Sequence, residues 1–180
     1  MYIIYKDEQI WKGHDYDIII NILGRRDSFN FLFIRNYLWE DERFMNKEKI
    51  LITGSVMNSD EELVNTYRSL ISMIDIENYQ VSTPLDTMMF KGNDYERYER
   101  AMTLLKDTKL MIAEMSITST GQGMELQQAV MYDIPILVIA KQGSKISSLV
   151  KGCKNVKNII YYDKIDDIKS DVKKFIEEDL

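Results

Sequence analysis

The sequence is poor in the residues that build disulfides and metal sites. Among 180 residues there is one cysteine, Cys153, and one histidine, His14. A disulfide within the chain needs two cysteines, and clusters of cysteine or histidine ligands need several such residues, so both are excluded. No apolar run reaches the roughly 18 residues of a membrane span, and no signal peptide is evident. We therefore expect a cytoplasmic protein with no membrane partner.

Positive charge is also scarce. The chain has 23 Lys and Arg against 29 Asp and Glu, for a net charge of −6. A general nucleic-acid binder needs a basic surface, so nucleic acid is not an expected partner. A chain of this length fits one domain, or one domain with an extension, and buries roughly 70% of its unfolded surface without added cross-links.

From residue 49 onward, short apolar runs alternate with helical patterns. The apolar runs predict strands at residues 49–53, 79–84, 110–115, 134–140 and 158–162. Helices are expected at about 60–74, 94–106, 124–130 and 165–180, and an irregular segment at 86–93. This alternation predicts an α/β fold: a doubly wound parallel sheet with helices on both faces.

The first 48 residues are predicted to form a separate N-terminal extension. Residues 2–5 suggest a strand, residues 17–23 a strand or a helix, and Ser28 the N-cap of a further helix. The extension is too rich in aromatic residues for a solvated arm. We expect it to pack on the main domain, residues 49–180, or on a partner subunit. His14 is expected to be a surface residue rather than a catalyst.

The segment from 110 to 130 carries the most informative pattern. The apolar run is followed by small, hydroxylated and glycine residues at 116–123, and then by apolar residues at helical spacing. In an open α/β sheet, strand, loop and helix in this order build a site at the carboxyl edge of the strands. Glycine backbone, hydroxyl groups and a helix N-terminus all favour a bound anion. We therefore expect residues 116–123 to form an anion-binding loop.

Glu125 is predicted to lie in the first turn of the helix behind this loop. The helix dipole would keep a carboxylate there ionised near neutral pH. Such a charge repels a neighbouring anion, but it suits a reaction that develops positive charge, such as the oxocarbenium ion of glycoside cleavage. The alternative is a first-turn glutamate that only stabilises its helix.

Two familiar glycine motifs are excluded. Gly121-x-Gly123 continues to Leu126, where the dinucleotide fingerprint requires a third glycine. Neither Gly121 nor Gly54 is followed by the Gly-Lys-Ser/Thr of a P-loop. The anion is therefore not expected to bind through either of these motifs.

Several short motifs follow one another along the main domain in an order that matches a known protein family. They are Lys49-Ile-Leu-Ile-Thr-Gly-Ser55, Tyr98-Glu99-Arg100, Ala113-Glu-Met-Ser116, Ser119-x-Gly121-x-Gly123-x-Glu125-Leu126 and Ile134-Pro135-Ile136. These resemble the nucleoside 2-deoxyribosyltransferase family, and most of all its 2′-deoxynucleoside 5′-phosphate N-hydrolase branch. The resemblance covers residues 49–180. It implies a flavodoxin-like (Rossmann-like) fold, a homodimer, and cleavage of the N-glycosidic bond of a nucleotide or nucleoside without cofactor or metal.

The resemblance also implies roles for the matched residues. The family's glutamate nucleophile corresponds to Glu125. A serine that reaches the phosphate of the neighbouring subunit corresponds to Ser147. The family's phosphate-binding residues correspond to Gly54, Ser55, Ser119, Gly121 and, more loosely, Gly123.

The chain departs from the family at an acidic position. The family's aspartate after the Glu-Arg pair, which helps orient or protonate the substrate, corresponds to Ala101, and an arginine of some members corresponds to Met57. Asp94 and Tyr98 precede Ala101 on one helical face, so either is a candidate replacement in catalysis. The alternative is a capping aspartate and a core tyrosine.

These residues leave three functions open. The first is an N-hydrolase or deoxyribosyltransferase with Glu125 as nucleophile. The second is a non-catalytic nucleotide-binding or sensing module, since Ala101 and Met57 are also what a degenerate site would carry. The third is cleavage of a dinucleotide such as NAD at its nicotinamide glycosidic bond.

Overall fold

A computed structural model describes residues 2–6, 9–13, 47–75 and 78–180. They divide into two units, Met1–Asn46 and Lys47–Leu180. In the first unit, β1 (Tyr2–Lys6) and β2 (Gln9–Gly13) form an antiparallel hairpin, which confirms the strand predicted at residues 2–5. The elements predicted at 17–23 and from Ser28, and the position of His14, lie outside the described residues.

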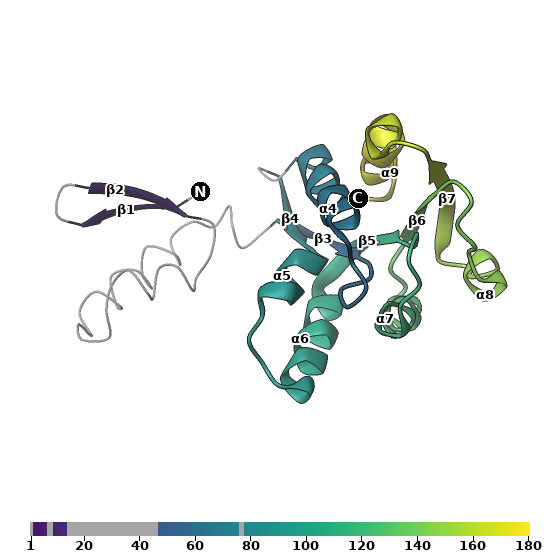
Figure 1. The fold of residues 1–180 in the computed structure, drawn as a ribbon, viewed down its shortest axis with the longest axis horizontal. Coiled ribbons are helices and arrows are strands. Elements are labelled where there is room, and N and C mark those ends of the chain that lie inside the picture. Colours follow the sequence, from purple (N-terminus) through teal and green to yellow (C-terminus); the bar gives the residue numbers. More distant parts are fainter. Residues whose placement is uncertain (1, 7–8, 14–46, 76–77) are drawn as a thin grey trace. The chain divides into compact units, whose positions relative to one another are not determined.

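The second unit is built on a five-stranded parallel sheet with the order β4-β3-β5-β6-β7 (Figure 1). Its strands are β3 (Glu48–Thr53), β4 (Tyr79–Ser82), β5 (Thr108–Glu114), β6 (Ile136–Lys141) and β7 (Val156–Tyr162). The predicted doubly wound α/β fold is confirmed. The chain enters at β3, continues to β4 on one side and then to β5 on the other. The switch point of the sheet, where open α/β folds bind ligands, therefore lies between β3 and β5.

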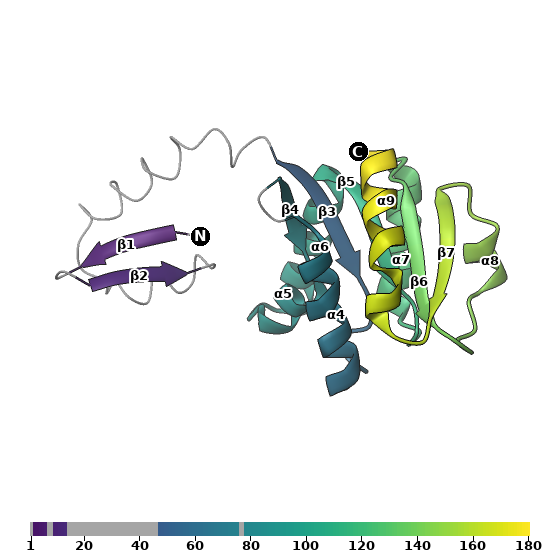
Figure 2. The same ribbon diagram turned by 90° about the horizontal axis from the view of Figure 1, so that it is seen from above.

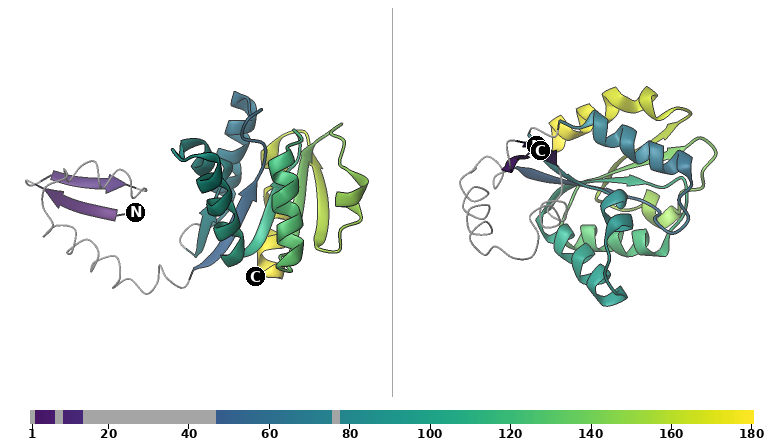
Figure 3. Two further views of the ribbon diagram at one scale, coloured as in Figure 1. Left: turned by 90° about the horizontal axis from the view of Figure 1, so that it is seen from below. Right: turned by 60° about the vertical axis from the view of Figure 1, so that its left-hand side comes forward.

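Helices cover both faces of this sheet. The helical elements are α4 (Glu61–Met73), α5 (Pro84–Met89), α6 (Asp94–Asp107), α7 (Thr120–Met131), α8 (Ser148–Lys151), the 3₁₀ turn η1 (Ile165–Ile168) and α9 (Lys169–Asp179). Figures 2 and 3 show α4 and α9 on one face, and α6 and α7 on the other. In the part of the chain described, no helix is long and apolar enough to cross a membrane.

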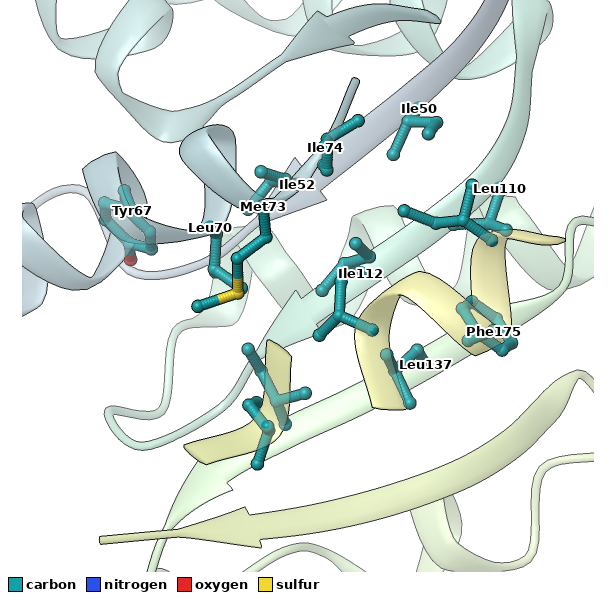
Figure 4. Close-up of a cluster of buried hydrophobic side chains, with 14 of the residues drawn as sticks. Ile50, Ile52, Tyr67, Leu70, Met73, Ile74, Leu110, Ile112, Leu137 and Phe175 are labelled. Carbon is teal, nitrogen blue, oxygen red and sulfur yellow. The ribbon is translucent and has the colours of Figure 1, made fainter. Parts of the chain in front are cut away.

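The central strands β5 and β6 are largely apolar and buried because each face of the sheet has its own core. Alternate residues of a strand point to opposite faces. Ile50 and Ile52 of β3 pack with α4 and α9, in the cluster shown in Figure 4. Leu51, between them, packs with residues of α6 and α7. Since Thr53 shares the alternation of Leu51, the end of β3 presents its side chain to the face covered by α6 and α7.

The prediction of an irregular segment at 86–93 is wrong, because its first part is helical. Pro84 occupies the first position of α5, where its fixed backbone angle and missing N–H suit a helix start. The Asp86 carboxylate accepts a hydrogen bond from the Thr83 backbone N–H at 2.7 Å. This capping contact outweighs the turn-like composition of the residues that follow.

Candidate active site

A cleft opens where β3 ends, beside the switch point of the sheet. Its empty space is continuous with open solvent. The turn after β3, helices α5 and α6, and one residue of α7 line it. The side chains and turn positions that matter for its chemistry are Thr53, Gly54, Phe90, Arg97, Arg100 and Glu125.

Glu125 is the only carboxylate among the cleft-lining residues that the structure describes. Its predicted place in the first helical turn is wrong: α7 begins at Thr120, so Glu125 is the sixth helical residue. Glycine and hydroxyl residues predicted as loop belong to the helix instead. The second-turn position turns Glu125 toward β3, where the Thr53 hydroxyl donates a hydrogen bond to its carboxylate.

Burial governs the charge of Glu125. Half-burial in the cleft wall raises the pKa of its carboxyl group, and the hydrogen bond from Thr53 acts in the opposite direction. The helix dipole, which was expected to keep Glu125 ionised, acts mainly within the first turn. In the structure, desolvation is the larger influence, and it disfavours the charged form.

The predicted anion-binding loop is shorter than expected. Ser119 is the N-cap of α7, and its hydroxyl makes no capping hydrogen bond. The backbone N–H groups at the first helical positions, including Gly121, have no acceptor within the helix. Gly123 differs, because its N–H donates to the Ser119 carbonyl at 3.2 Å. Ser119 and Gly121 are thus free to meet an anion, whereas the backbone donor of Gly123 is already used.

Gly54 and Ser55 form the turn after β3. A Cβ atom at Gly54 would lie 2.3 Å from the Tyr67 hydroxyl oxygen, so the packing of Tyr67 alone requires glycine there. The Tyr67 hydroxyl donates to the Ser55 carbonyl at 2.8 Å and fixes the turn. The Ser55 hydroxyl is buried and has no hydrogen-bond partner among the described residues. Buried hydroxyls rarely lack a partner, so this one marks a place where a further polar group fits.

One face of α6 forms the opposite wall of the cleft. Arg97, Arg100, Ala101 and Leu104 line it at helical spacing. Ala101 therefore does face the cleft at the position where the resemblance expects an aspartate. A methyl group stands there in place of a carboxyl group.

The other predicted site residues lie outside this cleft. Asp94, the first residue of α6, is exposed, and Tyr98 is 48% exposed rather than a core residue. Neither lines the cleft. Ser147 caps the short helix α8, and its side chain accepts from the Leu149 N–H at 3.3 Å. Of the predicted site residues, the cleft lining thus brings together only Glu125 and Gly54. It does not include Ser55, Ser119, Gly121, Gly123, Asp94, Tyr98 or Ser147 of the same chain.

Two arginines of the cleft were missed by the sequence analysis. The Arg100 guanidinium lies 5.0 Å from the centre of the Phe90 ring, and that of Arg97 lies 5.8 Å from it. The Glu96 carboxylate, one helical turn before Arg100, accepts from the Asn93 N–H at 2.8 Å as part of a capping box. The spacing of Arg97, Arg100 and Ala101 on one helical face was the signal that could have placed both arginines in the site.

Comparison with known proteins identifies the family of this chain. No family model matches the chain. A protein of Methanosarcina mazei, provisionally named 2′-deoxynucleoside 5′-phosphate N-hydrolase 1, is 30% identical over 112 residues, which cover 59% of this chain and 69% of the relative. The chain belongs to the 2′-deoxynucleoside 5′-phosphate N-hydrolase family. The predicted family is confirmed, and with it membership of an enzyme family.

Solved structures show the same fold at lower identity. The CMP N-glycosidase BcmB of Clostridium botulinum is 17% identical with a TM-score of 0.55, and the match covers 71% of this chain and 99% of that one. A 2-deoxyribosyltransferase of Bacillus psychrosaccharolyticus is 14% identical with a TM-score of 0.52, over 67% of this chain and 90% of that one. At these identities the likeness concerns the fold alone.

A second glutamate supports the site of this N-hydrolase family member from the other face of the sheet. Glu114, at the end of β5, is fully buried, and burial raises the pKa of its carboxyl group. It accepts hydrogen bonds from the Tyr162 hydroxyl at 2.8 Å and from the side chain and backbone of Ser116. The network ties the end of β7 to the start of the loop that leads into α7.

Gln122 completes this support. Its side-chain amide donates to the Glu114 carbonyl at 2.8 Å and to the Thr53 carbonyl at 3.2 Å. The first turn of α7 is thereby fixed to the ends of both β3 and β5. Thr53 ends β3 and Glu125 lies on α7. Because Gln122 joins these two elements, it helps to position the hydrogen bond between Thr53 and Glu125.

Proposed function

We propose that the chain cleaves the N-glycosidic bond of a nucleotide or nucleoside, with Glu125 as the nucleophile. The observation that carries this proposal is the place of Glu125: a half-buried carboxylate, held by Thr53, in a cleft at the switch point of the sheet. The names of the relatives support the reaction class, because they describe hydrolysis of 2′-deoxynucleoside 5′-phosphates and of CMP.

The reaction proceeds in two displacements. A carboxylate oxygen of Glu125 attacks C1′ of the sugar while the C1′–N bond breaks and its electron pair leaves with the base. Water, or a second base, then attacks C1′ and releases Glu125. The hydrogen bond from Thr53 engages Oε2 and holds the carboxylate in one orientation, which leaves Oε1 for the attack.

A phosphate group of the substrate is expected at the start of α7. Ser119 is the N-cap residue of α7, and its hydroxyl makes no capping hydrogen bond. The first N–H groups of the helix have no acceptor within it, and the positive end of the helix dipole favours an anion there. The unpartnered Ser55 hydroxyl lies in the neighbouring turn and offers a further donor. Binding the phosphate would place the sugar over Glu125, so that binding energy remote from C1′ positions the reacting atoms.

We also propose a homodimer. The family resemblance implies that Ser147 reaches the phosphate of the neighbouring subunit, and Ser147 does not line the cleft of its own chain. Leu149, two residues further on, is 85% exposed, as an interface residue would be in the isolated chain.

Asp94 and Tyr98 are also exposed on α6, and we propose them as candidate catalytic residues in place of the family's aspartate.

The proposal is tested by following base release. The purified protein is incubated with ribo- and deoxyribonucleoside 5′-monophosphates, the matching nucleosides and NAD, and free base is measured by chromatography. Glu125→Gln should lower kcat by about 10³-fold or more, because the nucleophile is lost. Glu177→Gln, a matched change at an exposed glutamate of α9, should leave kcat unchanged. Full activity of Glu125→Gln would contradict the proposed mechanism.

The second candidate is a nucleotide-binding module without catalysis. Ala101 favours it, since the cleft lacks the family's aspartate at this position. Tight binding of a nucleoside monophosphate, with no base released even at high protein concentration, would support this reading over the first. Release of nicotinamide from NAD alone would instead support a dinucleotide glycohydrolase.

A further inference from the structure

Two cationic side chains share the cleft with Glu125. Arg97 and Arg100 both line it, and both guanidinium groups lie over the Phe90 ring, at 5.8 and 5.0 Å from its centre. A cation over an aromatic face is attracted by the ring's negative charge density. Phe90 therefore holds two positive charges at the wall opposite the proposed nucleophile.

The two arginines differ in what else they contact. Arg97 donates to the Thr87 carbonyl at 3.4 Å, which ties it to α5. Across the described residues, the Arg100 guanidinium has no hydrogen-bond acceptor and no carboxylate within ion-pair distance. All five of its N–H donors are therefore open to a ligand.

The position of these arginines matches one part of the substrate. The phosphate is expected at the start of α7, and C1′ lies at Glu125. Glu125 attacks C1′ from the face opposite the departing base, so the base points away from Glu125 and α7. The cleft residues that come from α5, α6 and the turn between them include Phe90 and Arg100, which are therefore candidates to meet the base.

We propose that Arg100 binds the leaving nucleobase and stabilises the negative charge that it acquires as the C1′–N bond breaks. This inference rests on the proposed function. As Glu125 forms its bond to C1′, the electron pair of the C1′–N bond moves onto the base, and Arg100 donates hydrogen bonds to the resulting anion. Arginine keeps its proton at any physiological pH, so the departed base takes its proton from water. Phe90 and Arg97 are positioning residues for Arg100.

This arrangement selects a substrate class. In a pyrimidine, the charge left on N1 is shared directly with the neighbouring carbonyl oxygen O2, a good acceptor for a guanidinium. A purine departs most easily once N7 has been protonated, which requires an acid. Ala101 removes the carboxyl group from the wall where the family places its aspartate. The favoured substrates are therefore pyrimidine nucleotides.

The test compares leaving groups of different acidity. The substrates are 2′-deoxyuridine 5′-monophosphate and its 5-fluoro analogue, whose base is more acidic and needs less stabilisation. Arg100→Ala should lower kcat on the first substrate by about 10²-fold or more. The fold-loss of kcat on the 5-fluoro substrate should be at least about ten times smaller. Arg100→Lys, which keeps the charge, should restore part of the loss. Arg68→Ala, at an exposed arginine of α4, is the matched control and should match the wild type.

Each outcome bears on one proposal or both. An equal loss of kcat on the two substrates would mean that Arg100 does not act on the leaving group, and would overturn this inference alone. Faster release of purines than of pyrimidines by the wild type would overturn the substrate class. If the wild type released no base from any nucleotide, the proposed function would fail as well. Thermal melting of each variant confirms that it is folded, as expected for changes at exposed side chains.

Discussion

At the scale of single residues, the proposed chemistry of the cleft depends on the hydrogen-bonded pair Thr53–Glu125. Burial raises the pKa of Glu125, while the Thr53 hydroxyl stabilises the ionised form and lowers it. A nucleophilic carboxylate acts only when it is ionised. The rate should therefore rise with pH through a pKa above the ordinary glutamate value, on the acid side of the profile.

Removing the Thr53 hydroxyl should move this limb. In Thr53→Val the ionised form of Glu125 loses a hydrogen bond while the burial remains, so its pKa rises further. The acid limb of the pH profile of kcat is expected to shift to higher pH. The shift is measured by following the rate of base release between about pH 4 and 8. Thr103→Val, at an exposed threonine of α6, should leave the limb in place. A limb that stays put, or shifts to lower pH, would show that Thr53 does not tune the nucleophile.

Prediction from sequence reached Glu125 but not its partners. Glu125 stands within a recognisable local motif, with small residues before it and a helix around it. Thr53 is 72 residues away from Glu125 in the sequence. The arginines of α6 lie over the ring of Phe90, which belongs to the end of a different helix, α5. Such contacts depend on how the elements pack, which periodicity does not reveal. The anion-binding loop predicted at residues 116–123 was too long. Glycines usually weaken a helix, but Gly121 and Gly123 lie within the first residues of α7.

At the scale of elements, the Glu114 network joins strand ends to the start of α7. The Tyr162 hydroxyl donates to Glu114 at 2.8 Å from the end of β7, and the Ser116 side chain accepts from the Lys141 N–H at 2.8 Å at the end of β6. A buried carboxylate is costly unless it is hydrogen-bonded. The network therefore stabilises the carboxyl edge of the sheet only while its donors are intact.

Tyr162→Phe tests this dependence. The change keeps the ring and removes one donor from a fully buried carboxylate, so it should lower the free energy of unfolding by about 1–3 kcal/mol. Urea unfolding at neutral pH measures the loss. Tyr132→Phe, at a tyrosine that is 40% exposed, should change stability by less than about 0.5 kcal/mol. Equal, small effects at both positions would mean that water replaces the missing donor.

At the scale of the whole molecule, the strand order places the cleft. In the order β4-β3-β5-β6-β7 the chain reverses direction across the sheet between β3 and β5. A crevice forms at such a point because the loops that follow the two neighbouring strands run to helices on opposite faces of the sheet. Glu125 on α7, the turn at Gly54 and the wall of α6 meet there, although the sequence separates them widely.

The sheet and most helices could be predicted because their signals are local. Apolar runs marked the strands, and acidic residues from Asp60 onward marked a helix start. The helix α5 was missed because its capping contact, between Thr83 and Asp86, resembles the turn chemistry of an irregular segment. The composition of the cleft wall follows from packing and could not be predicted in the same way.

The most direct test of the central claim, that Glu125 attacks C1′, is the stereochemistry of transfer. The enzyme acts on a β-configured deoxynucleotide in the presence of methanol, and proton NMR assigns the configuration of the methyl glycoside formed. Two displacements through a covalent Glu125 intermediate predict the β product, with retained configuration. The α product would show that water or methanol attacks directly, and would contradict the role of Glu125 as nucleophile.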